Sequence, residues 1–149
     1  MADRSRIRCI AICVIQHHRR WLVLEGYDPV SQDYFYRPLG GGIELGETGS
    51  DAVQREFFEE TGHRITTPEY KETLENIFIY KGKVCHELVR VYAADLRDEA
   101  LYQEEQIIAH EDNGTPFKVL WVPVQDFINR SKRLVPEGLL LFLNPTDPY

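Results

Sequence analysis

The sequence predicts a mixed α/β fold, because strand-like apolar runs alternate with one segment that carries clear helix start and stop signals. The chain has 149 residues, the size of one ordinary domain. Its apolar fraction of 43% and charged fraction of 28% are close to globular averages. It contains no internal repeat or low-complexity tract. We therefore expect residues 1–149 to form a single domain around one core.

The strand-like runs are separated by turn residues. Residues 7–15 are mostly apolar and partly β-branched, which suits a central strand buried on both faces, although a buried helix would show the same pattern. Residues 21–24 predict a second strand, so the opening of the chain indicates a hairpin. Three further strands are expected at 72–80, 83–95 and 117–122, the first two joined by a turn at Lys81-Gly82.

One helix is expected at about 50–61, because residues 48–50 offer N-caps, Asp51 suits the positive helix end and Gly62 suits the C-terminal cap. Two short helices are expected near the end of the chain, one after Pro123 and one at 137–143. Two segments are interpreted as loops, an aromatic one at 27–37 and an acidic, irregular one at 97–115.

The composition excludes several function classes. The net charge of −7 argues against a nucleic-acid backbone binder but not against a small phosphorylated substrate, since a bound divalent cation inverts the local sign. No apolar run approaches the ~18–20 residues that span a bilayer. The cysteine number is odd, and Cys9 and Cys13 would lie about 13 Å apart along one strand, too far for a disulfide. We expect a reduced, cytoplasmic setting.

Three carboxylates share one face of the expected helix. Glu56, Glu59 and Glu60 are spaced i, i+3 and i+4, so they fall within an arc of about 100°. Their repulsion requires water, a basic partner or a cation, and Arg55 alone does not neutralise three charges. The alternative is a solvated acidic face. Hard oxygen ligands of this kind suit Mg²⁺ or Mn²⁺.

The surrounding residues resemble the signature box of the Nudix hydrolases. The run from Gly41 to His63 reads GGIELGETGSDAVQREFFEETGH. It departs from the family pattern at His63, where the family usually has an aliphatic residue. The matching positions at fixed spacing are Gly41, Glu47, Arg55, Glu56, Phe57, Glu59, Glu60 and Gly62.

This resemblance implies an α/β/α sandwich around a mixed sheet, with the box as a loop, a helix and a loop. It further implies Mg²⁺-dependent hydrolysis of a phosphoanhydride bond in a nucleoside diphosphate linked to another moiety, with Mn²⁺ as an alternative metal. The carried-over roles are metal coordination for Glu56, Glu59 and Glu60, a carbonyl ligand for Gly40, and orientation of the carboxylates for Arg55 and Glu47.

The general base and the substrate are less constrained by sequence. In the family the base comes from the box or from a distant loop, so Glu59 is our first choice and three loop glutamates are the alternatives: Glu104, Glu105 and Glu111. Tyr80 and Tyr36 are candidate substrate contacts. Tyr80 stands 17 positions after His63, where the family associates a tyrosine with dinucleoside polyphosphates, which gives a weak lean to that class.

The expected partner is a small nucleotide-derived substrate rather than a membrane or a nucleic acid, and a homodimer is left open. Two other functions remain as alternatives. A Nudix-like binding or sensor domain would be expected to have lost a box glutamate, whereas all are present. An acidic protein-interaction module would leave Arg55 and Glu47 unexplained.

Overall fold

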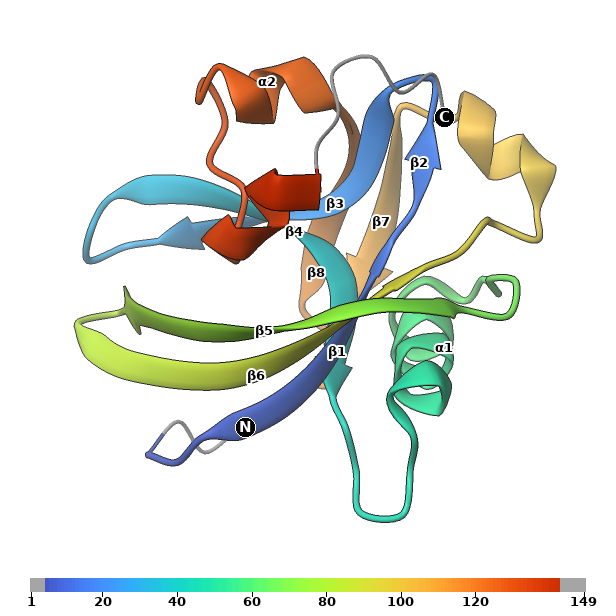
Figure 1. Cartoon of the computed structure of the whole chain (residues 1–149). Helices are drawn as coiled ribbons and strands as arrows, with labels where there is room; N and C mark the ends of the chain where they lie inside the picture. Colours follow the sequence, from blue (N-terminus) through green and yellow to red (C-terminus); the bar gives the residue numbers. More distant parts are fainter. Residues whose placement is uncertain (1–4, 143–149) are drawn as a thin grey trace.

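The computed structural model describes residues 5–142, and a single mixed sheet forms its centre (Figure 1). The elements in chain order are β1 (Arg8–Val14), β2 (Gln16–His17), β3 (Arg20–Asp28), β4 (Asp33–Gly42), α1 (Gly49–Thr61), β5 (Glu69–Tyr80), β6 (Lys83–Ala93), the 3₁₀ helix η1 (Glu99–Gln103), β7 (Gln106–His110), β8 (Pro116–Pro123), α2 (Val124–Ile128) and the 3₁₀ helix η2 (Glu137–Phe142).

The strand order is β5-β6-β1-β4-β3-β8-β7, with β2 attached to β3. β1 runs parallel to β6, and the other neighbouring strands are antiparallel. β4 joins the two halves of the sheet, because its first part pairs with β3 and its last residues pair with β1. In Figure 1 the β3–β4 hairpin and the β5–β6 hairpin project toward the same side of the molecule.

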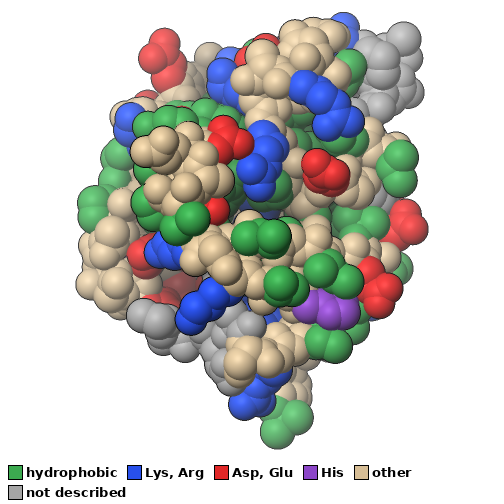
Figure 2. Space-filling view, turned by 90° about the vertical axis from the view of Figure 1, so that its left-hand side faces the viewer, with side chains coloured by type: hydrophobic (Ala, Val, Ile, Leu, Met, Phe, Trp, Pro, Cys, Tyr) green, Lys and Arg blue, Asp and Glu red, His purple; other side chains and the backbone are tan. Residues whose placement is uncertain are grey.

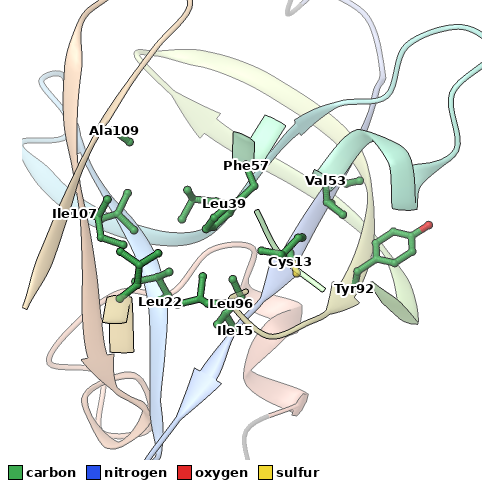
Figure 3. Packing of buried hydrophobic residues seen from close by; sticks show 14 of the residues in the cluster. Cys13, Ile15, Leu22, Leu39, Val53, Phe57, Tyr92, Leu96, Ile107 and Ala109 are labelled. Atoms are coloured by element: carbon green, nitrogen blue, oxygen red, sulfur yellow. The ribbon is translucent and has the colours of Figure 1, made fainter. Parts of the chain in front are cut away.

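Helices cover both faces of this sheet, which gives the α/β/α sandwich that the sequence predicts. α1 inserts Val53 and Phe57 into a buried cluster that includes Leu39, as Figure 3 shows. On the other face α2 and η2 contribute Phe127 and Leu139 to a second cluster. Burial of such side chains is worth about 1.5–3 kcal/mol each, so the first cluster fixes α1 against one face of the sheet and the second fixes α2 and η2 against the other.

The local signals around α1 and the second hairpin are confirmed. The Thr48 hydroxyl accepts a hydrogen bond from the Asp51 N–H, and Gly62 ends the helix at a φ of 77°. β5 and β6 meet at Lys81 and Gly82, whose φ values are 51° and 77°. Two positive φ values in a two-residue turn are typical of a tight hairpin that matches the twist of its strands.

Two expectations about the chain's order are wrong, and a third is confirmed in part. The segment 27–37 is not a loop, because the end of β3 and much of β4 pair there across a short turn. The segment 97–115 contains η1 and β7. The opening hairpin is present between β2 and β3 and is extended by a hydrogen bond from the Leu22 N–H to the Ile15 carbonyl at 3.0 Å, whereas β1 pairs with β4 and β6.

The final expected helix is a 3₁₀ helix, η2, and its expected last residue, Leu143, lies outside the described residues. Pro123 is the N-cap residue of α2, as the start signal indicates. Cys9, Cys13 and Cys85 form no disulfide with one another. Within the range 5–142, no helix is long and apolar enough to cross a membrane.

Candidate active site

Arg55 on α1 organises the loop that leads into the helix. Its Nε donates to Glu47 Oε2 at 2.7 Å, and its Nη2 donates to Glu47 Oε1 at 2.9 Å. The same Nη2 donates to the Gly42 carbonyl at 3.0 Å, so the guanidinium joins the helix to the end of β4. Such a two-bond contact fixes orientation as well as charge, because the planar fork matches the planar carboxylate.

The remaining amino group of Arg55 reaches two of the three candidate metal ligands. Nη1 donates to Glu56 Oε1 at 3.0 Å and to Glu59 Oε2 at 3.3 Å. The Glu59 side chain is 47% exposed, whereas that of Glu56 is 20% exposed. Arg55 therefore holds both carboxylates in place from one side while leaving Glu59 open to solvent.

The backbone at Gly41 lies directly against Glu56. A Cβ atom at position 41 would stand 2.5 Å from the Glu56 carboxylate carbon, which is closer than any side chain tolerates. The absence of a side chain at Gly41 thus lets the Glu56 carboxylate of α1 approach the backbone of β4 closely. Burial raises the pKa of Glu56 against the lowering effect of Arg55.

Glu60 differs from the other box glutamates because its unpartnered oxygen is buried. Its Oε1 is buried and has no hydrogen-bond partner among the described residues. Burial, reinforced by the negative charge of Glu56, raises the pKa of Glu60 to about 8. A buried, unpaired carboxylate oxygen is costly, so it indicates a missing positive partner.

The acidic residues that follow β7 lie near Glu56 and Glu60. Glu111 and Asp112 both add negative charge that raises the pKa of Glu60, and Asp112 acts on Glu56 in the same direction. Glu104 and Glu105 precede β7, at the other end of a five-residue strand about 17 Å long. Of the three loop glutamates, Glu111 is the one that the fold brings to the box.

The carboxylates of the box have the chemistry of a divalent-cation site. The orphaned Glu60 oxygen, the neighbouring Glu56 carboxylate and the hard oxygen chemistry of both suit Mg²⁺ or Mn²⁺. Across residues 5–142, however, no three His, Cys, Asp or Glu side chains already converge on one point. The donor set therefore fits the metal, and its final convergence requires the side chains to rotate.

A cavity of about 350 Å³ lies between the two projecting hairpins. Its wall includes Phe35 and Arg37 from β4 and Phe78 and Tyr80 from β5. Figure 2 faces the side on which both hairpin tips lie, and basic, acidic and hydrophobic side chains are interspersed there without a continuous field of one sign. A mixed surface of this kind fits a small ligand better than a nucleic-acid backbone.

Arg37 connects the cavity with the box. It lines the cavity, its Nη2 donates to the Gly40 carbonyl at 3.5 Å, and its positive charge lowers the pKa of Glu60 against the larger effect of burial. An anion bound in the cavity would therefore have a guanidinium on the side of the carboxylates. Gly40, the candidate carbonyl ligand, lies at this same junction.

The two tyrosines selected from the sequence occupy different places. Tyr80 lines the cavity, with its ring 5.8 Å from that of Phe35 in an edge-to-face contact. Tyr36 is 7% exposed and donates its hydroxyl to Glu25 Oε2 at 2.9 Å. It borders a separate depression beside α2 rather than this cavity. The role of each as a substrate contact stays a prediction.

Sequence reasoning missed Arg37 and Asp112. Arg37 fell inside the segment interpreted as a loop, where the alternation of Phe35, Arg37 and Leu39 on one face could have indicated a strand. Asp112 follows Glu111 directly, but nothing local marks it as a neighbour of α1.

The model of the NUDIX domain family matches residues 5–139. Among solved structures, the chain is similar to a NUDIX hydrolase from Nitrosomonas europaea at a TM-score of 0.61 and 15% identity, covering 88% of this chain and 82% of that one. It is similar to a MutT NUDIX hydrolase from Burkholderia pseudomallei at a TM-score of 0.59 and 18% identity, covering 81% and 86%.

A third similar structure comes from work on MutT of Aliivibrio salmonicida and Vibrio cholerae, at a TM-score of 0.58 and 18% identity, covering 92% of this chain and 94% of that one. At such identities these likenesses show a shared fold. No curated protein sequence matches the chain. From the family match over most of its length, the chain belongs to the NUDIX family and is a hydrolase that cleaves the pyrophosphate bond of a nucleoside diphosphate derivative.

Proposed function

We propose that this hydrolase requires Mg²⁺, with Mn²⁺ as an alternative, and cleaves a nucleoside diphosphate linked to another moiety, with dinucleoside polyphosphates as the first class to test. The observation that carries the proposal is the unpaired, buried oxygen of Glu60 next to an Arg37-lined cavity. We further propose that residues 1–149 form one NUDIX domain, which the match over 5–139 supports.

In this proposal Glu56, Glu59 and Glu60 hold the metal with the Gly40 carbonyl. When bound, Mg²⁺ supplies positive charge for the phosphate oxygens and lowers the pKa of water. Arg55 keeps Glu56 and Glu59 oriented through its hydrogen bonds, and Glu47 keeps Arg55 oriented. Arg55 thus sets the starting positions of Glu56 and Glu59, from which the side chains would rotate to converge on a metal.

The reaction needs an aligned water, a base and a stabilised leaving group. Arg37 neutralises phosphate oxygens at the cavity end nearest the box. Glu59, which is exposed and held by Arg55, takes the proton as water oxygen bonds to phosphorus, and the bond from phosphorus to the bridging oxygen breaks. The freed phosphate leaves with the electron pair of that bond. Glu111 is the alternative base.

A substrate panel tests this proposal. NDP-sugars, dinucleoside polyphosphates, NTPs and capped RNA are incubated with Mg²⁺ or Mn²⁺, and release of phosphate, pyrophosphate or nucleotide is followed. We expect turnover of at least one class with either metal and none in EDTA. Hydrolysis in H₂¹⁸O identifies the phosphorus that receives the new oxygen. Full turnover in EDTA would contradict the metal requirement, and binding without turnover across the panel would favour a sensor domain.

A further inference from the structure

A strand edge forms part of the cavity wall. β5 is the terminal strand of the sheet, and it meets β6 through a two-residue turn at Lys81-Gly82. In such a hairpin the pair that flanks the turn exchanges hydrogen bonds, and the pairing then alternates along the strands. The N–H and C=O groups of Ile79 and Ile77 therefore point away from β6, toward the free edge.

The position of the two isoleucines agrees with this alternation. Their side chains are each 66% exposed and point to the outer face of the hairpin, yet both residues line the cavity. Their contribution to the wall is therefore their peptide edge. An extended residue presents its N–H and C=O side by side, as an amide does, so the edge offers paired donors and acceptors to a flat ligand.

Asn76 adds an amide side chain to the same wall. It lines the cavity on the inner face of β5, opposite Glu87 of β6. No hydrogen bond joins its side-chain amide to another residue of the range 5–142. An amide in this position offers one acceptor and two donors to a ligand.

Three charged groups of the cavity wall, Asp28, Glu87 and Arg133, are already engaged, and a further carboxylate, Glu137, lies exposed at the start of η2. Asp28 accepts the N–H groups of Val30 and Lys81 at 3.0 and 3.2 Å. Glu87 pairs with Arg8 at 3.2 Å, and Arg133 pairs with Asp33 at 3.1 Å. Asp28 and Glu87, which could accept the two adjacent donors of guanine, and Arg133, which could donate to its acceptors, are thus occupied, whereas the Asn76 amide is available.

The cavity also offers flat aromatic walls. Phe35 and Tyr80 stand edge to face with an interplanar angle of 86°. The Phe35 ring is held over Gly26, where a Cβ atom would overlap it, so the ring position is fixed by β3. Aromatic faces of this kind stack on any nucleobase, so they supply affinity without selecting the base.

We propose that this cavity binds the adenine base of the nucleotide substrate and that Asn76 is the residue that selects it. The inference rests on the proposed function for the presence of a nucleotide. Asn pairs bidentately with adenine by donating to a ring nitrogen and accepting from the exocyclic amino group. The peptide edge of β5 and the rings of Phe35 and Tyr80 hold the plane of the base, and Arg37 lies on the phosphate side.

Direct binding tests the selection without requiring turnover. The four nucleoside monophosphates AMP, GMP, CMP and UMP are titrated into the full chain by calorimetry in EDTA. We expect AMP to bind most tightly and Asn76→Ala to weaken AMP by about 5- to 150-fold, with smaller losses for the others. Asn76→Asp replaces a donor by an acceptor at nearly constant shape, so we expect the ratio of GMP to AMP affinity to rise.

Asn129→Ala is the matched control, because Asn129 follows α2 and lies outside the cavity wall. Equal binding of the four nucleotides by the wild type would overturn the inference. So would equal losses for all four in Asn76→Ala together with an unchanged ratio in Asn76→Asp. AMP selectivity without hydrolysis in the substrate panel would instead contradict the proposed function and leave the base selection standing.

Discussion

The carboxylates of the loop that leads into α1 and of the inner side of α1 differ in their hydrogen bonding and in the direction of their pKa shifts. In the loop, Glu47 accepts two hydrogen bonds from Arg55 and one from the Glu44 N–H, and the contact with Arg55 lowers its pKa. On the inner side, Glu60 has an oxygen without a partner and a raised pKa. The paired carboxylate is a fixed part of the scaffold, and the unpaired one is available for a ligand.

Glu59 is intermediate between Glu47 and Glu60, because one of its oxygens contacts Arg55 while its side chain is nearly half exposed. We predict that Glu59→Gln lowers kcat by about 10²- to 10⁴-fold at saturating Mg²⁺ and also weakens metal binding, because it removes both the base and an anionic ligand. Steady-state kinetics with metal titration measure both effects. The control is Glu104→Gln, because Glu104 precedes β7 at the end of that strand that is far from the box. A near-normal kcat in Glu59→Gln beside a loss of at least ~100-fold in Glu111→Gln would assign the base to the loop.

Glu60→Gln tests the role of the unpaired carboxylate directly. We predict that it weakens Mg²⁺ binding and lowers activity at limiting metal by about 100-fold, because a neutral amide replaces an anionic ligand at nearly constant shape. Folding is expected to survive, as circular dichroism would show. The control is Glu69→Gln at the exposed start of β5. Wild-type metal affinity in Glu60→Gln would remove this residue from the ligand set.

Variants of Arg55 test the role of the carboxylates that are paired with it. Arg55→Ala is expected to lower activity by about 10- to 100-fold, because Glu47, Glu56 and Glu59 lose the group that orients them. Arg55→Lys is expected to recover only part of this loss, since an ammonium group does not reproduce the two-bond fork. Arg64→Ala, which removes an arginine that stacks on Phe58, is the control. A wild-type rate in Arg55→Ala would contradict the orienting role.

The smallest expected effect is on stability. In EDTA the raised pKa of Glu60 means that the folded protein retains a proton that the unfolded chain releases between the usual value of 4.5 and about 8. This stabilising contribution is complete below pH 4.5 and is lost as the pH rises through about 8. Thermal unfolding from pH 5 to 9 should therefore show a steeper fall in Tm for the wild type than for Glu60→Gln. Parallel curves would contradict this.

The parts of the fold that the sequence predicts are those with local signals. Thr48 and Gly62 mark the ends of α1, and Lys81-Gly82 marks the turn between β5 and β6, because cap and turn geometries depend on neighbouring residues. β7 was missed because it is a short terminal strand in an acidic stretch, with only Ile107 and Ala109 buried. Its strand pairing depends on β8, which a local pattern does not reveal.

In the site, too, contacts between residues close in sequence could be predicted and contacts made by the tertiary fold could not. The contact of Arg55 with Glu59 follows from their i, i+4 spacing and that with Glu47 from the resemblance to the box, and the structure contains both. The approach of Arg37 to Glu60 could not be predicted, because it depends on how β4 passes from one half of the sheet to the other. The approach of Asp112 depends in turn on the packing of β7 against α1.

The close approach of Gly41 to Glu56 limits how this region can vary or be engineered. Gly41 has no positive φ, so any residue could adopt its backbone conformation, yet every side chain would displace the Glu56 carboxylate. Gly46 shows the reverse, with a φ of 85° and open space around it. In a saturation library, position 46 should therefore accept Asn or Asp, which tolerate positive φ, whereas replacements at position 41 should fold but lower activity, because the Glu56 carboxylate would have to move away from Arg55.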